Sequence, residues 1–172
     1  MAGPLGDSAR PADRIGRVIF AAARALSLLG GLLMVGLAAM VVASVLGRWL
    51  FLAPIPGDFE LVAMGTAVAV FLFLPYCHLA RGNVLVDLFL SGAPRRVQVL
   101  FDVLGALILA VIAGALAWRM VFGGVDIHHY NETTLILGLP VWLAFPFAVL
   151  GLALLCVSCL YTAVRDLLDA LR

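Results

Sequence analysis

The chain has 172 residues, of which 65% are hydrophobic and 12% are charged, and its mean hydropathy is +1.16. Soluble domains carry about 45 to 50% apolar and about 25% charged residues, so this chain has more apolar surface than a globule of its size can bury. A net charge of +1 gives no support for a nucleic-acid partner. The three cysteines are an odd number, which argues against a secreted disulfide scaffold. We therefore expect an integral membrane protein.

Residues 1–24 precede the first long apolar stretch and are rich in arginine. Arg10, Arg14, Arg17 and Arg24 recur at helical spacing, and apolar side chains such as Ile19 fall on the opposite side. This pattern predicts a cytoplasmic amphipathic lead-in whose arginines meet the anionic headgroups of membrane lipids at the inner leaflet. Packing of the same helix on a partner protein is the alternative.

Four apolar stretches follow, and each is long enough for a helix to cross a hydrocarbon core about 30 Å thick. They are residues 25–47, 60–80, 97–118 and 138–163. Because backbone polar groups in hydrocarbon need partners within their own segment, each stretch is predicted to be a transmembrane helix. The first is longer than the roughly 7 to 15 residues of a signal-peptide core, which indicates an uncleaved anchor.

The predicted fold class is therefore all-α: a single membrane domain, residues 1–172, folded as a four-transmembrane-helix bundle. Its fourth helix is expected to begin near Pro140 and to kink at Pro146, because proline is tolerated in a first helical turn but not further along.

The distribution of arginine predicts the orientation of the chain. Nine of the eleven arginines lie on one side of the four-span arrangement, and Arg48 and Arg119 lie on the other. Basic residues near helix ends tend to stay in the cytoplasm, so both termini are predicted to be cytoplasmic.

The cytoplasmic segment 82–94, between the second and third spans, is too short to cross the membrane. Its Asn83, Asp87 and Ser91 form a polar stripe at four-residue spacing. A short interfacial helix is predicted there, and an irregular loop is the alternative.

No ionisable side chain lies near the middle of any span, where such groups usually mark ion or substrate paths. Asp102 lies about 12 Å along its helix from the cytoplasmic end. We interpret it as pairing with Arg95, Arg96 or a neighbouring helix, and a coupling carboxylate is the alternative. Small residues recur every four positions in Ala39-Ala43-Gly47 and Ala106-Ala110-Gly114, a spacing that permits close helix packing within the bundle or onto another membrane protein.

The cysteines and histidines give weak metal signals. Cys156 and Cys159, with Cys77 and His78 also near cytoplasmic ends, suggest a soft metal site, but a straight helix lacks the knuckle turn of zinc sites. The adjacent pair 128–129, both histidines, is expected in an external loop, whereas haem ligands belong on facing helices inside a bundle. We therefore expect no metal, no cofactor and no enzymatic activity.

On the external side, charged residues gather around the helix ends. Two interpretations stay open: helix capping with local ion pairing, or recognition of a soluble partner through complementary charge. The residues are Arg48, Asp58, Glu60, Arg119, Asp126 and Glu132.

Several short motifs occur in a fixed order along the chain. They are Gly47-Arg48, Pro56-Gly57-Asp58-Phe59-Glu60, Leu74-Pro75, Arg81-Gly82-Asn83-Val84-Leu85-Val86-Asp87, Glu132-Thr133-Thr134 and Leu139-Pro140-Val141-Trp142. Together with the four-span plan, this order resembles the small membrane subunit (DctQ-type small permease) of tripartite ATP-independent periplasmic (TRAP) transporters.

The resemblance implies a bacterial or archaeal inner-membrane protein with two protein partners. One is a large permease subunit that carries the substrate and sodium path, and the other is a periplasmic substrate-binding protein. The resemblance places Arg48, Glu60, Asp87 and Glu132 at assembly or docking positions, and Asp58 joins them from the external charged group. The chain departs from the family at two positions: Asn83 stands where His is common, and Phe59 stands where the first acid of a Glu-Glu pair is frequent.

The function expected from the sequence is a non-catalytic brace for the large subunit during uptake of an organic acid or a related solute. Three alternatives stay open: the small subunit of a tripartite tricarboxylate transporter, an autonomous four-helix antiporter, and a membrane redox subunit. The antiporter requires a mid-span carboxylate, and the redox subunit requires haem ligands inside the bundle.

Overall fold

The structure, a computed structural model, describes residues 14–53, 55–80 and 95–170. This part of the chain forms four long helices: α1 (Arg14–Phe51), α2 (Asp58–Leu79), α4 (Arg95–His129) and α5 (Ala144–Ala170). A short 3-10 helix, Val141–Leu143, precedes α5. All four long helices are long and apolar enough to cross a membrane, which confirms the predicted all-helical architecture with four spans.

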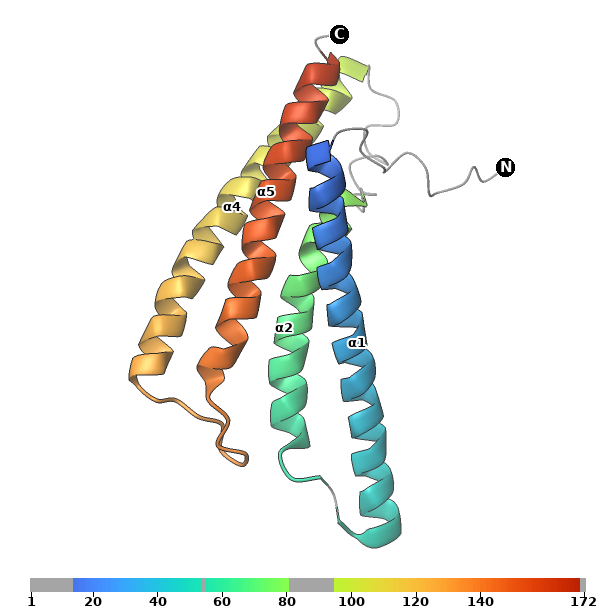
Figure 1. The fold of residues 1–172 in the computed structure, drawn as a ribbon, viewed down its shortest axis with the longest axis vertical. Coiled ribbons are helices and arrows are strands. Elements are labelled where there is room, and N and C mark those ends of the chain that lie inside the picture. Colours follow the sequence, from blue (N-terminus) through green and yellow to red (C-terminus); the bar gives the residue numbers. More distant parts are fainter. Residues whose placement is uncertain (1–13, 54, 81–94, 171–172) are drawn as a thin grey trace, which may run out of the picture.

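The four helices stand side by side in one layer (Figure 1). α4 packs on α5, α5 packs on α2, and α2 packs on α1, while α1 touches α5 only lightly. The prediction of a bundle is corrected in this respect, because α1 and α4 form the two edges of an open row. Lipid chains solvate apolar helix faces as well as protein does, so a membrane helix need not turn its apolar side toward a common centre.

Glycines set the closest approaches between neighbouring helices of the row. Gly151 of α5 lies so close to the Phe71 carbonyl of α2 that a Cβ atom at this position would overlap it. At Gly30 of α1, a Cβ atom would come within 3.3 Å of the side chains of Leu72 and Phe73. The α2–α5 contact matters most for the cohesion of the row, because it joins the α1–α2 hairpin to the α4–α5 hairpin.

The α4–α5 pair contains a compact buried cluster. Its members are Ala110, Ala113, Leu152, Leu155 and Cys159. On α4, Ala106 and Ala110 are buried and a Cβ atom at Gly114 would contact Cys156 at 3.7 Å, so the small-residue stripe of the third span packs on α5. On α1, by contrast, Ala39 and Ala43 are exposed.

The first helix begins at Arg14, so residues 14–24 are continuous with the first span. Ala23 and Ile19 are buried within the chain, and the Phe20 ring lies 5.7 Å from the Tyr76 ring of α2. This part of the helix therefore packs against the end of α2. Contact of its arginines with lipid headgroups stays a prediction.

Two helix boundaries differ from the expected ones. α4 continues to His129, so His128 and His129 end a helix and are not in an external loop as expected. Glycine costs about 1 kcal/mol relative to alanine inside a helix, but at Gly124 a Cβ atom would lie 2.9 Å from the Phe145 Cβ, so the close approach of these two segments requires glycine. α5 begins at Ala144, so Pro146 lies in its first turn and no kink is needed there.

The beginning of α1 and the end of α5 lie at the same end of the molecule (Figure 1). We call the opposite end, where one loop joins α1 to α2 and another joins α4 to α5, the loop end. Which end faces the cytoplasm stays a prediction. The predicted interfacial helix 82–94, with Asn83 and Asp87, lies outside the described residues.

Candidate functional site

Asp58, at the start of α2, is anchored within the chain at the loop end. The Ser44 hydroxyl of α1 donates a hydrogen bond to Asp58 Oδ2 at 2.6 Å, and the Phe59 N–H donates to Oδ1 at 2.7 Å. The same Ser44 oxygen accepts the Ile55 N–H at 3.3 Å, and the Ser44 side chain is only 1% exposed. Asp58 also lies in the first helical turn, where the helix dipole stabilises a negative charge. Its carboxylate therefore fixes the loop between α1 and α2.

Glu60, in the first turn of α2, binds the loop between α4 and α5. Its Oε1 accepts the Ile136 N–H at 2.8 Å, and its Oε2 accepts the Leu137 N–H at 3.0 Å. Hydrogen bonds to an ionised carboxylate are stronger than those between neutral groups. Glu60 thus holds the first hairpin to the second across 76 residues of sequence.

The loop that Glu60 holds is a folded turn, which we call the 133–140 turn. The Thr134 N–H donates to the Leu139 carbonyl at 2.9 Å, and the Thr134 hydroxyl accepts the Leu139 N–H at 3.0 Å. Thr133 and Pro140 pair as an isolated antiparallel bridge. The turn has its own internal hydrogen bonds, so Glu60 positions a preformed element.

The tip of the 133–140 turn is apolar. Leu135 is 99% exposed and Ile136 is also exposed, whereas Leu137 lies against Gly57 of the neighbouring loop. Gly57 has φ 75°, and a Cβ atom at this position would overlap the Leu137 side chain. Glycine is therefore required at position 57 both for its backbone conformation and for this contact.

The remaining external charges do not form the expected single group. Arg48 is exposed in the last turn of α1, and its positive charge favours the ionised form of the Asp58 carboxyl group. Glu132 is exposed, and its carbonyl accepts the Val141 N–H at 3.1 Å. Arg119 lies ten residues before the end of α4, about 15 Å along the helix from His129, and is therefore separated from the loops.

A second polar connection joins α2 to α5 at the opposite end. The Nε2 atom of His78 lies 3.0 Å from the Thr162 hydroxyl. The other ring nitrogen, Nδ1, is buried without a hydrogen-bond partner in the described part of the chain. Glu60 and His78 are thus polar links near the two ends of α2.

Cys77 lies on α2, whereas Cys156 and Cys159 lie one turn apart on α5. Cys77 is exposed on α2, Cys159 is buried, and the Cys156 thiol donates to the Ala110 carbonyl at 3.4 Å. Among the described residues, no group of three His, Cys, Asp or Glu side chains is placed to hold a metal ion. Asp102 is half-buried near the start of α4 and has an interaction partner.

Sequence reasoning missed the residues that hold the loops together, namely Ser44, Thr134 and Leu137. Ser44 carried a signal, because it is a lone hydroxyl in an apolar run fourteen residues before Asp58. The partners of Glu60 carried none, because they are main-chain N–H groups that every residue except proline possesses.

A comparison with protein families matches residues 37–169 to the DctQ component of tripartite ATP-independent periplasmic transporters. The chain belongs to this family. The matched range contains the loop end, the part of α1 from residue 37 onward, all of α2, α4 and the 133–140 turn, and α5 except its last residue. Neither a comparison with curated proteins nor one with solved structures gives a significant match.

Membership of the DctQ family confirms the resemblance found in the sequence. Together with four helices long enough to span a bilayer, it makes the chain a multi-pass membrane protein and a component of a tripartite transporter. It also favours the TRAP assignment over the tricarboxylate system and the autonomous antiporter.

Proposed function

We propose that the chain is the non-catalytic small permease subunit of a TRAP transporter, and that it braces a large subunit that moves substrate together with sodium. The single-layer arrangement of the helices supports this role most directly. A path for a hydrated solute needs polar groups that are shielded from lipid on all sides. A row one helix thick offers no such enclosure, whereas its broad apolar faces suit lateral contact with another membrane protein.

The proposed location is the inner membrane of a bacterium or archaeon, with both termini in the cytoplasm. The excess of arginine on the side of the termini supports this orientation. The loop end then faces the periplasm, where the substrate-binding protein of the system docks. The cargo in this proposal is an organic acid or a related solute.

The five predicted interface residues take different parts in this proposal. The exposed Arg48 and Glu132 contact the binding protein directly, and their opposite charges suit complementary patches on it. Asp58 and Glu60 act indirectly, because their carboxylates hold the two loops in shape. Asp87 contributes to assembly on the cytoplasmic side.

Reconstitution into proteoliposomes tests the division of labour. We expect no solute uptake by the isolated chain, and uptake only when the large subunit, the binding protein and an inward sodium gradient are all present. A tagged copy should also co-purify with the large subunit from native membranes. Robust uptake by the isolated chain would contradict the proposal.

Charge reversal tests docking at the loop end in the complete system. Arg48→Glu and Glu132→Arg should each raise the concentration of binding protein needed for half-maximal uptake, with a strong dependence on ionic strength. Arg17→Glu is the matched control, because Arg17 is an exposed arginine at the opposite end of the row. Equal effects of all three variants would argue against docking at the loop end.

A further inference from the structure

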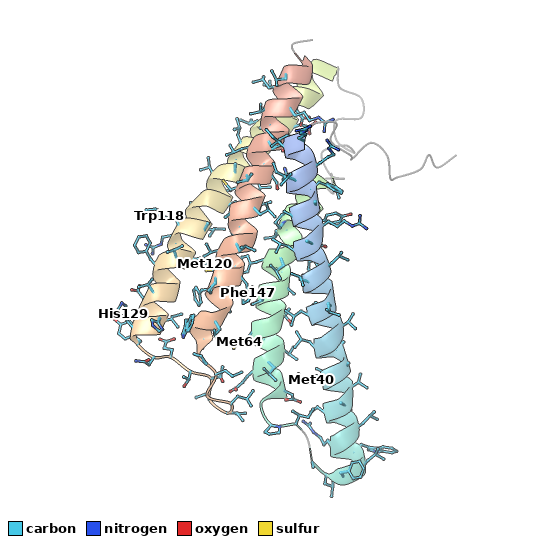
Figure 2. The ribbon with its side chains drawn as sticks, in the orientation of Figure 1. Met40, Met64, Trp118, Met120, His129 and Phe147 are labelled. Atoms are coloured by element: carbon cyan, nitrogen blue, oxygen red, sulfur yellow. The ribbon has the colours of Figure 1, made fainter. Side chains whose placement is uncertain are left out.

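A groove of about 640 Å³ lies between α4 and α5 near the loop end. Its walls include Met120, Gly124 and His128 on the α4 side and Trp142, Phe145 and Val149 on the other side. Figure 2 labels Met120 and His129 on α4, the helix that forms one wall. The lining is almost wholly apolar. No role described so far for the loop end uses this groove.

Small residues on both walls explain why the groove exists. Gly124 approaches Phe145 so closely that a Cβ atom would lie 2.9 Å from the Phe145 Cβ, and Ala153 adds little bulk to the α5 wall. The lining side chains Val121, Val125 and Leu150 are each about half exposed, so the groove opens to the surroundings of the helices. In a chain that spans a membrane, those surroundings are hydrocarbon.

The polarity of the groove changes from one end to the other. Its apolar part extends along α5 from Phe145 to Ala153, eight residues or about 12 Å of helix. Its polar groups lie at the loop end, where the ring centroids of His128 and Trp142 are 5.1 Å apart in an edge-to-face contact. Trp and His side chains of this kind place a polar ring nitrogen next to apolar surface, an arrangement typical of the membrane interface.

We propose that this groove binds one acyl chain of a membrane phospholipid, with the lipid's ester and headgroup region beside His128 and Trp142. An amphiphile with a long apolar chain and one polar end matches the observed change in polarity. An organic anion does not match it, because a carboxylate in the apolar part would lose its hydration without gaining a hydrogen-bond partner.

The size of the groove fits a small-molecule ligand. Its volume of about 640 Å³ falls within the range of about 300 to 1,000 Å³ that is usual for such sites. Together with the apolar lining, this size suits an extended hydrocarbon chain.

Fluorescence quenching of Trp142 in the full-length chain tests the proposal. The double variant Trp49→Phe/Trp118→Phe leaves Trp142 as the only tryptophan. In detergent micelles, phosphatidylcholine with brominated acyl chains should quench its emission along a saturable curve. The control retains only Trp118, which is 67% exposed and projects from α4 on the side away from α5 (Figure 2). Its quenching should rise without saturation.

Variants that fill the groove provide the decisive comparison. Ala153→Phe and Val121→Phe, from opposite walls, should each raise the half-saturating lipid concentration about tenfold, because the ring displaces part of the acyl chain. Val157→Phe is the matched control, since Val157 is an exposed position one turn further along α5 and outside the lining. It should leave the curve unchanged.

Three results would overturn the proposal. The first is an unchanged half-saturation point in both groove-filling variants, each shown by circular dichroism to be folded. The second is identical quenching curves for Trp142 and Trp118. The third is a complex purified with its native membrane partners in which Trp142 is inaccessible to brominated lipid and no phospholipid is retained, which would identify the groove as a protein interface.

Discussion

The two edge helices of the row, α1 and α4, carry the same spacing of small residues but use it differently. On α4, Ala106 and Ala110 are buried against α5, whereas Ala39 and Ala43 of α1 are exposed. α1 packs closely on α2 elsewhere, at Gly30 and at Leu37, which lies against Gly65 of α2. Small-residue spacing therefore shows that a helix can be approached closely, but the position of the neighbour decides which small residues are buried.

The largest effect is expected at the contact that joins the two hairpins. Gly151→Ala places a Cβ atom onto the Phe71 carbonyl, and a backbone group cannot move aside as a flexible side chain can. We expect a loss of about 3 kcal/mol in the free energy of unfolding, at the upper end of overpacking effects. Unfolding in mixed micelles, followed by circular dichroism, measures it.

Gly36→Ala is the matched control for this variant. A Cβ atom at Gly36 of α1 would meet nothing within 4 Å, so alanine should be neutral or stabilise the helix by up to about 1 kcal/mol. Equal destabilisation by both variants would mean that helix propensity, and not the α2–α5 contact, determines the result.

The next largest effect is expected from a substitution in the small-residue stripe of α4, compared with the same substitution in the stripe of α1. Ala110→Leu inserts three carbon atoms into the buried α4–α5 contact and should cost about 2 kcal/mol in the free energy of unfolding. Ala39→Leu makes the same change at an exposed position of α1 and should alter the stability of the isolated chain by less than about 0.5 kcal/mol. A larger cost at Ala39 would show that α1 packs against a surface other than the one described.

Ser44→Ala should have an intermediate effect, confined to the α1–α2 hairpin. It removes a buried hydroxyl that donates to a charged carboxylate, so we expect a cost of about 1.5 kcal/mol. A double-mutant cycle with Asp58→Asn isolates the pair, and the effects of the two substitutions should not add. Strict additivity would indicate that the Ser44–Asp58 hydrogen bond contributes nothing to stability.

The smallest effect is expected at the link between the two loops. Glu60→Gln removes the negative charge and one of the two carboxylate oxygens that accept the Ile136 and Leu137 N–H groups, and because these hydrogen bonds are exposed we expect a small loss of stability. Hydrogen exchange of the Ile136 and Leu137 amides should nevertheless accelerate, since each loses a charged acceptor. Glu132→Gln, at an exposed carboxylate in the same region, should leave both exchange rates unchanged.

The sequence was more informative about the helices than about the external site. Long apolar stretches predicted four spanning helices, and the described part of the chain has four helices long and apolar enough to span a membrane. The positions of His128 and His129 were predicted wrongly, because the third span was expected to end at residue 118 and the helix instead continues to His129. Glu60 was selected for its charge and position, but its hydrogen-bond partners lie 76 and 77 residues away.

The sequence by itself determined the number of spans and the family, because a helix in lipid must satisfy its own backbone and must be apolar along its length. Only the tertiary structure decided that the helices form a row in the order α1, α2, α5, α4, and that Glu60 joins its two halves. The physical reason is that lipid and protein offer an apolar side chain nearly the same environment. Hydrophobicity thus determines which segments enter the membrane, while close backbone contacts and hydrogen bonds between distant residues decide which helices become neighbours.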